Sequence, residues 1–383
     1  MRKILWMLLC VGWLGLLAGC ATVRFYNQAI WGQLRLLQAR TPVDDMLQHR
    51  QTSSALAGQL RTAQSIIEFA QSDIGIAPNG RYASFVAVPA DHVVWNLFAA
   101  KPDSLRGVQW CYPIVGCAPY RGFFAESAAL QAAAEYERQG YEIYVAGVAA
   151  YSTLGWFDDP LLSTFIQWPP AELAHLLIHE LAHGRVWAKN DVTFNESFAE
   201  FVAIRGTWEW LLTRGLEPLQ QSYLASSSVR RAFNVFLLQA KSLLQEVYDG
   251  APPPGVIDKA GALQAIRQCY QHNRERLGAG RYDRMIADHL NNAFFVSVGA
   301  YSEDVPAFAA LFNQSKQNWS VFFDAVDDLA RMQGAARRNR VAQLKRQQRL
   351  AEHKVDDTGN DRGANEVDCQ AFAGHPADGD TPS

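Results

Sequence analysis

The amino-acid sequence predicts an α+β fold that is predominantly helical. Apolar residues recur at helical spacing before residue 75 and again, in longer stretches, after residue 168. Between these parts lie short runs rich in β-branched and aromatic residues, which predict a small β-sheet. We therefore expect a mixed N-terminal part at 20–165, a helical part at 166–333, and a basic helix followed by a disordered tail at 334–383.

The sheet region and its flanking elements have recognisable boundaries. Two strand-like runs are separated by Pro89-Ala90-Asp91, which predicts a hairpin between them. An alanine-rich helix should end at Gly140, just before a third strand. The expected elements are helices within 25–75, strands at Tyr82–Val88 and His92–Phe98, a helix at Glu126–Gln139 and a strand at Glu142–Val148.

The second half of the chain predicts helices almost throughout. One should run from Gln220 to Tyr248 and another from Lys259 to Leu277, each followed by glycine or proline. Six arginines and lysines between 337 and 349 predict a basic, solvated helix, with contact to anionic lipid or a neighbouring protein as the alternative. Residues 355–383 contain few apolar side chains and are expected to be disordered.

The N-terminus is typical of a secretory signal peptide. Arg2 and Lys3 precede an apolar run that ends in Leu-Ala-Gly-Cys, so residues 1–19 are the expected leader. The ending resembles a bacterial lipobox, which implies a mature chain that begins at a lipid-modified Cys20. A plain signal peptide or an uncleaved anchor is the alternative. Acyl chains would give the protein its affinity for a membrane.

Composition limits the function further. A net charge of −3 argues against nucleic acid as a partner, and 49% hydrophobic residues can fill a core. An exported protein enters an oxidising compartment, so its cysteines are expected to pair. Cys111 and Cys117 enclose a turn-like segment and predict a local disulfide, with a cysteine zinc site as a weaker alternative. Pairing of Cys269 with Cys369 is possible.

A His-Glu-x-x-His sequence lies in the first of two helices expected between Trp168 and Trp210. Residues four apart share one helix face, so His179 and His183 can direct their imidazoles at one point, as two zinc ligands do. Glu180 is placed to take a proton from a water beside the metal. The alternative is a buried histidine pair, although burying these polar groups is costly without a metal or a partner.

A catalytic zinc usually has three protein ligands, so another side chain should return to the motif. Gly184 can end the first helix, and Lys189-Asn190-Asp191 predicts a turn. A helix starting near Thr193 would carry Glu196 in its first turn and Glu200 one turn later on the same face. On the residues alone, either glutamate can be the third ligand.

The HELAH motif followed by an Asn-Glu pair resembles the gluzincin metallopeptidases, which bind zinc through two histidines and a later glutamate. Together with WCYPIVGCAPYRGFF, GVAAYSTLGWFDDP and NNAFFVSVGAYSEDVPAF, these motifs are similar to a bacterial family designated "putative aminopeptidase", whose members are often lipoproteins. The resemblance covers about residues 23–335 of the chain. It implies a zincin-like metallopeptidase with zinc as its cofactor and a peptide as its substrate.

The resemblance assigns Glu196, the glutamate of the Asn-Glu pair, as the third ligand. Glu200 would then orient a ligand histidine, although it also remains an alternative ligand. One feature departs from the pattern, because only residues 184–195 separate His183 from Glu196. This spacing is shorter than in the well-studied gluzincin aminopeptidases, so the loop must be tight.

Four other residues are candidates for substrate contacts. Tyr151 lies in the segment before the metal helix, where an edge strand can hold a substrate backbone by strand addition. A core strand and turn is an equal alternative there. Asp158 and Asp159 could bind a free substrate amine. The hydroxyl of Tyr301 could stabilise an oxyanion, although a tyrosine hydrogen-bonded in the core is the simpler interpretation.

The sequence thus predicts zinc-dependent peptide hydrolysis, with aminopeptidase specificity implied by the resemblance. Zinc would be bound by His179, His183 and Glu196, and Glu180 would transfer protons. An endopeptidase and a catalytically inactive envelope-binding lipoprotein with a structural zinc are the alternatives. The residue after Cys20 is alanine, which by resemblance favours a lipid anchor in the bacterial outer membrane, facing the periplasm.

Overall fold

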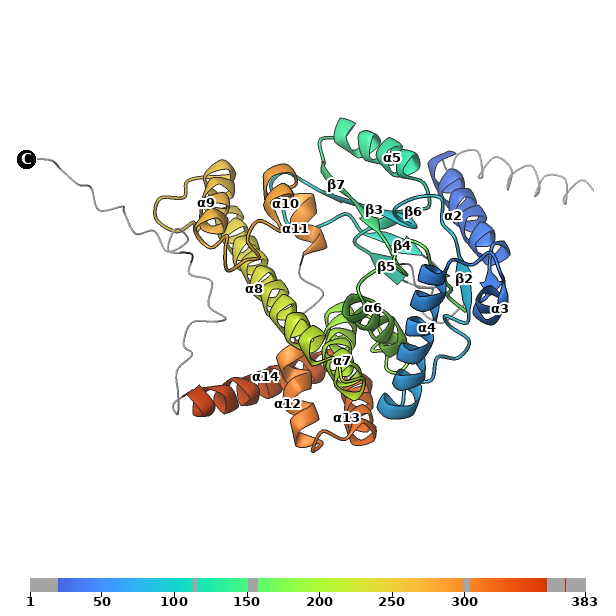
Figure 1. Ribbon diagram of the computed structural model, residues 1–383. Coiled ribbons are helices and arrows are strands. Elements are labelled where there is room, and N and C mark those ends of the chain that lie inside the picture. The colour runs from blue at the N-terminus through green and yellow to red at the C-terminus, as the bar shows by residue number, and fades with distance from the viewer. Residues whose placement is uncertain (1–19, 113–115, 151–157, 299–303, 357–368, 370–383) are drawn as a thin grey trace, which may run out of the picture.

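The computed structural model describes residues 20–112, 116–150, 158–298, 304–356 and 369 (Figure 1). Helices predominate, and small sheets occur in the N-terminal half, which confirms the predicted α+β class. Among the helices within these ranges, none is long and apolar enough to cross a membrane. The predicted leader and nearly all of the predicted disordered tail lie outside the described residues.

The N-terminal part begins with helices, as predicted. Ser53 caps the helix at Ser54–Phe69, because its hydroxyl accepts the Leu56 N–H at 3.2 Å. One face of that helix is fully buried through Leu60, Ala63 and Ile66. The bounds are α2 Cys20–Gln38, α3 Val43–Gln48, α4 Ser54–Phe69 and the π-helical turn η1 Ala70–Ile74.

Eight short strands form three small sheets in the described residues. The orders are β1-β2-β8, β6-β3-β7 and β4-β5. The longest pairing joins β3 to β7 in antiparallel register from Val94↔Val148 to Ala100↔Glu142. The bounds are β1 Thr41–Pro42, β2 Ser84–Val86, β3 Val94–Ala100, β4 Trp110–Tyr112, β5 Gly116–Ala118, β6 Arg121–Phe123, β7 Glu142–Val148 and β8 Leu161–Leu162.

The predicted hairpin around Pro89-Ala90-Asp91 is wrong. The strands on either side of it, β2 and β3, belong to different sheets. Strand β2 is flanked by β1 on one edge and by β8, in parallel, on the other, so neither edge is free for β3. The Ser163 hydroxyl also accepts the Val88 N–H at 2.8 Å, which keeps the chain after β2 beside β8. The predicted strand Glu142–Val148 is confirmed as β7.

The helix before β7 is also confirmed. Helix α5 spans Glu126–Arg138 and ends where Gly140 adopts a left-handed φ of 83°.

Later in the chain, α9 ends at His272, five residues before the predicted Leu277. The side chain of Asn273 donates to the Cys269 carbonyl at 3.0 Å, and Gly278 then turns the chain with a φ of 104°.

The second half forms the helical body that the sequence predicts. Helices α6 and α7 pack against each other and, together with α4, α12 and α13, contribute to the largest cluster of buried apolar residues. The bounds are α6 Pro170–His183, α7 Val192–Thr213, α8 Glu217–Tyr248, α9 Lys259–His272, α10 Asp283–Asp288, α11 Asn292–Ser297, α12 Val305–Gln314, α13 Trp319–Arg331 and α14 Gly334–Asp356.

The basic helix α14 is present, but it is not solvated on all sides. Arg337, Val341 and Leu344 are buried in its first turns, where the helix packs against α12 and α13.

Two disulfides join parts of the chain. Cys111 and Cys117 face each other across β4 and β5, and Cys269 of α9 is linked to Cys369.

Candidate metal centre

Helix α6 presents the HExxH residues. Pro170 at its first position suits a helix start, because proline has no N–H to donate there. One side of the helix is fully buried through apolar residues, which fixes its rotation. These residues are Leu173, Ala174, Leu177, Ile178, Leu181 and Ala182. His179 and His183 project from a neighbouring, partly accessible side, with ring centroids 4.9 Å apart.

Helix α7 brings the glutamates back to these histidines. Asp191 is its N-cap, and Oδ1 of Asp191 accepts the Phe194 N–H at 3.2 Å. The predicted turn before it is present, because Asn190 adopts a left-handed φ of 59°. The helix therefore begins one residue before the expected Thr193, and Glu196 lies near its first turn.

A buried asparagine holds the short loop between the two helices. Oδ1 of Asn195 accepts the Ala188 N–H at 2.7 Å, and Nδ2 donates to the Ala188 carbonyl at 2.9 Å. Both backbone groups of Ala188 are thereby satisfied by one side chain, in a place where water has little access. The asparagine of the Asn-Glu pair thus shapes the tight loop and fixes the neighbouring Glu196.

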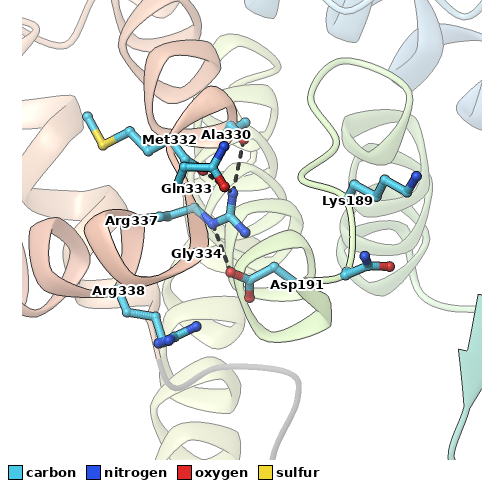
Figure 2. Close-up of a pocket in the computed structure, with 9 residues that line it drawn as sticks. Lys189, Asp191, Ala330, Met332, Gln333, Gly334, Arg337 and Arg338 are labelled. Atoms are coloured by element: carbon cyan, nitrogen blue, oxygen red, sulfur yellow. Dashed lines mark hydrogen bonds and ion pairs between the residues drawn. The ribbon is translucent and has the colours of Figure 1, made fainter.

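The basic helix α14 supports the same region from outside. Nε of Arg337 donates to Oδ2 of Asp191 at 2.8 Å, while Nη1 donates to the Ala330 and Met332 carbonyls (Figure 2). Because Arg337 is only 6% exposed, little solvent screens this ion pair. A cavity of about 540 Å³ lies beside the pair, and Lys189 and Arg338 also line it.

His179, His183 and Glu196 converge as the resemblance implies. Nε2 of His179 lies 3.3 Å from Oε2 of Glu196, and Nε2 of His183 lies 3.6 Å from the same oxygen. The three donor atoms lie within 4.8 Å of one another. Two imidazole nitrogens and one carboxylate oxygen form a donor set that suits zinc with one position left open.

Glu200 faces the other nitrogen of His179. Its Oε2 lies 3.6 Å from Nδ1 of His179, whereas Glu196 is next to Nε2. When the imidazole of His179 is neutral, a carboxylate near Nδ1 favours the tautomer that leaves Nε2 free to bind a metal. This position agrees with the orienting role that the resemblance implies.

His175 also belongs to this network, although the sequence analysis did not identify it. Its Nε2 lies 3.1 Å from Oε2 of Glu200, and its Nδ1 lies 2.7 Å from the Tyr223 hydroxyl. The signal was present in the sequence, because His175, His179 and His183 follow one another at intervals of four on one helix face. His175, His179 and Glu200 form a second group with metal-binding geometry, which shares His179 with the first.

The histidines and glutamates of this site shift one another's pKa values. Burial raises the pKa of the Glu196 carboxyl, but hydrogen bonds from His179 and His183 outweigh burial and lower that pKa to about 2. Burial also raises the pKa of Glu200, but the neighbouring His175 and His179 outweigh burial and lower that pKa. Burial lowers the pKa of His179, yet hydrogen bonds to both glutamates raise it to about 10. The site therefore favours positive charge between its carboxylates.

Arg81 holds the C-terminal end of α6. Nη1 donates to the Glu180 carbonyl at 2.9 Å and Nη2 to the Leu181 carbonyl at 3.3 Å, which satisfies groups that a helix end leaves without partners. The guanidinium passes so close to Gly184 that a Cβ there would lie 2.4 Å from Nη2. Gly184 ends the helix as predicted, and its lack of a side chain admits Arg81.

Two tyrosines lie within electrostatic reach of Glu180. Burial raises the pKa of Tyr82, and the carboxylates of Glu180 and Asp159 raise it further. Burial also raises the pKa of Tyr120, with further contributions from Glu196 and Glu180. Tyr120 follows β5, packs 5.7 Å from the Phe98 ring and is 38% exposed as a whole residue, while its phenol is buried enough to raise its pKa. Sequence analysis missed it because it lies 60 residues before Glu180 in the chain.

The remaining predicted residues have different positions. Tyr151 and Tyr301 lie outside the described residues, as does the side chain of Cys20. Asp158 is exposed, and its carbonyl accepts a hydrogen bond from Arg40 at 3.1 Å. Asp159 is buried, and its carbonyl accepts the Tyr82 N–H at 2.7 Å, which connects this segment to the Glu180 side of the site.

Comparison with known proteins identifies the family of the chain. Curated proteins and solved structures give no match. A family model described as "putative aminopeptidase" matches residues 24–341, which is most of the sequence and includes every described residue of the metal centre. The chain therefore belongs to this aminopeptidase family.

Proposed function

We propose that this protein is a zinc-dependent aminopeptidase. The observation that carries the proposal is the convergence of His179, His183 and Glu196 from α6 and α7, with Glu180 beside the first histidine. The family match supports peptide hydrolysis as the reaction class. Zinc bound there would lower the pKa of a water molecule and polarise the scissile carbonyl.

The residues of the chain have separate tasks in this proposal. The Glu180 carboxylate accepts a proton from the attacking water and passes it to the leaving amine. The Glu200 carboxylate lies beside Nδ1 of His179 and orients its ring, His175 holds Glu200, and the Tyr223 hydroxyl holds His175 in turn. These contacts limit the rotation of the ligand ring, which keeps the donor atoms in place between turnovers.

Tyr120 is the candidate hydroxyl for assisting the carbonyl oxygen of the substrate, because Glu196 and Glu180 both act on its pKa. Its raised pKa keeps the phenol protonated, so it can donate a hydrogen bond to an oxygen that gains negative charge. Tyr301 remains a sequence prediction for the same task. The two proposals are separable, since each tyrosine can be replaced by phenylalanine independently.

The substrate amine and backbone have candidate contacts on the sheet side. Strand β7 is the edge strand of the sheet β6-β3-β7 and leads into the segment that contains Tyr151. An extended peptide could add to that segment as a further strand. The exposed Asp158 is the candidate partner of a free amino terminus; Asp159, predicted for the same task, is buried.

Membrane attachment is part of the proposal. A lipid on Cys20 would tether the chain to the bacterial envelope, at the outer membrane and facing the periplasm. The sequence Leu-Ala-Gly-Cys supports this, as does the charged and then apolar run before it. Intact mass measurement of protein from the membrane fraction tests it. A chain starting at an acylated Cys20 is expected, and an uncleaved or unmodified chain would contradict it.

Hydrolysis of matched peptides tests the aminopeptidase proposal. Zinc-loaded protein should release the first residue of a peptide with a free amino terminus and leave its acetylated counterpart intact. Internal cleavage of both peptides would identify an endopeptidase. Stoichiometric zinc without cleavage of either peptide would favour the alternative of an inactive envelope-binding protein.

A further inference from the structure

Helix α2 attaches to the protein through one face only. On that face Phe25 is buried against Phe123, with ring centroids 5.7 Å apart. Gln28 donates to the Gly122 carbonyl at 3.3 Å and accepts the Phe124 N–H at 3.0 Å. Gly32 lies directly against the Phe124 ring, where a Cβ would be 2.2 Å from it. The rotation of α2 about its axis is therefore fixed.

The opposite face of α2 exposes four large hydrophobic side chains, with the polar Asn27 among them. Tyr26, Ile30 and Leu34 follow one another at intervals of four and are 38%, 56% and 39% exposed, and Trp31 beside them is 56% exposed. We call these four side chains the outer face of α2. No other stretch of this length in the described chain exposes as many large hydrophobic side chains. Figure 1 shows α2 at the edge of the molecule.

The charged residues of α2 itself have one sign, whereas the next helix, α3, carries Asp44 and Asp45. Arg24 and Arg35 are exposed. Because their positions in the sequence differ by eleven, they lie three helical turns apart on one flank of the outer face. Residues 20–40 contain no aspartate or glutamate. Apolar and aromatic side chains flanked by arginines are typical of helices that lie in the interface of an anionic membrane.

The position of α2 in the chain favours a membrane as the partner. Residues 4–19, which directly precede the helix, contain no charged side chain. Whether that segment is retained or replaced by a lipid on Cys20, the first turn of α2 would begin at the bilayer surface. A tether at that point brings the outer face within reach of the lipid headgroups.

We propose that the outer face of α2 lies in the interface of an anionic phospholipid membrane. Tyr26, Ile30, Trp31 and Leu34 would be buried among the headgroups and upper acyl chains, and Arg24 and Arg35 would contact lipid phosphates. Because α2 is fixed to β6 through its inner face, this contact would hold the whole body in one orientation on the membrane.

Photocrosslinking in the full chain tests this proposal. A benzophenone amino acid replaces Ile30 or Leu34, and the protein is reconstituted into vesicles of phosphatidylethanolamine and phosphatidylglycerol. The matched controls replace Leu224 of α8 and Val321 of α13, which are 45% and 52% exposed. Figure 1 places α13 far from α2. Lipid adducts at 30 and 34 should exceed those at 224 and 321 by at least about fivefold, as burial in the interface requires.

Three other outcomes of the crosslinking would overturn the proposal. Adducts to a second protein chain at positions 30 and 34 would show that a protein covers the outer face. Adducts to residues 1–19 of the same chain would show that its own N-terminal segment does so. Equal lipid yields at all four positions, or no adduct at 30 and 34, would show that the face is not a specific lipid contact.

A charge test provides a second readout. The double variant Arg24→Gln and Arg35→Gln, with the benzophenone at 30, should give at least about twofold less lipid adduct on these vesicles, because two phosphate contacts are lost. The control is Arg338→Gln on α14. Equal adduct yields would contradict the phosphate contacts. The thermal midpoint shows that each variant is folded, and neither test uses zinc or hydrolysis, so failure here is distinguishable from failure of the proposed function.

Discussion

The side-chain amide of Asn195 forms hydrogen bonds with both backbone groups of Ala188, at 2.7 and 2.9 Å. These bonds close the loop between the HExxH helix and the helix that carries Glu196. The short spacing between His183 and Glu196 is therefore compatible with a three-ligand site, because one buried side chain supplies the hydrogen-bond partners of both backbone groups of Ala188.

Asn195→Ala should reduce both stability and metal affinity. Two buried backbone groups lose their partners, so the free energy of unfolding should fall by about 1–3 kcal/mol. Zinc affinity should fall with it, because the start of α7 is no longer held. Urea unfolding and chelator competition measure the two quantities. Asn313→Ala on α12, at an exposed position, is the control and should change neither; the same result for Asn195→Ala would contradict the role of the loop.

Glu196 and Glu200 should differ in their effects on zinc binding. Glu196→Gln removes a ligand and should abolish most zinc affinity, whereas Glu200→Gln removes only the partner of Nδ1 of His179 and should weaken binding about 10–100-fold. Glu172→Gln in the first turn of α6 is the control. The opposite order of effects would place the metal at the group formed by His175, His179 and Glu200.

Tyr120→Phe should slow the reaction without releasing zinc. Loss of one hydrogen-bond donor to a developing oxyanion costs about 100–1,000-fold in kcat. Tyr26→Phe is a matched control, because both tyrosines are 38% exposed and Tyr26 lies on α2. Steady-state kinetics on zinc-loaded protein measures the change. An unchanged kcat would remove Tyr120 from the mechanism and leave Tyr301 as the candidate.

Gly184→Ala and Gly58→Ala should have opposite effects on stability. At position 184 the new Cβ would lie 2.4 Å from Arg81, so the guanidinium must leave the α6 carbonyls, at a cost of about 1–3 kcal/mol. At position 58, within α4, nothing lies within 4 Å, and alanine should stabilise the helix by about 0.5–1 kcal/mol. Denaturant unfolding compares the two. Equal stabilisation by both would show that Arg81 does not hold this helix end.

Patterns local in sequence predicted much of this structure. The spacing of His179 and His183, the turn before α7 and the strand β7 are all set within a few residues of the chain, and each is present. His175 had the same helical signal and was overlooked. Its partner Tyr223 lies on another helix, so the hydrogen bond itself could not be inferred from spacing.

Contacts between distant segments were beyond local patterns. The guanidinium of Arg81 reaches the end of α6 across 99 residues, and Arg337 reaches Asp191 across 146. The hairpin prediction failed for the same reason, since strand partners are decided by tertiary packing and not by the turn between two strands. The basic composition of α14 likewise did not reveal that Arg337 would be buried against the N-cap of α7.

Glu180→Gln is the most direct test of the central claim that the HExxH residues perform zinc-dependent peptide hydrolysis. The amide keeps the size of the side chain but cannot accept the water proton, so zinc content should match that of the unmodified protein. Turnover of a peptide with a free amino terminus should fall by about 100–10,000-fold. Zinc content by mass spectrometry and peptide release measured on the same samples give both quantities. A fully zinc-loaded Glu180→Gln protein that cleaves the peptide at the unmodified rate would contradict the claim.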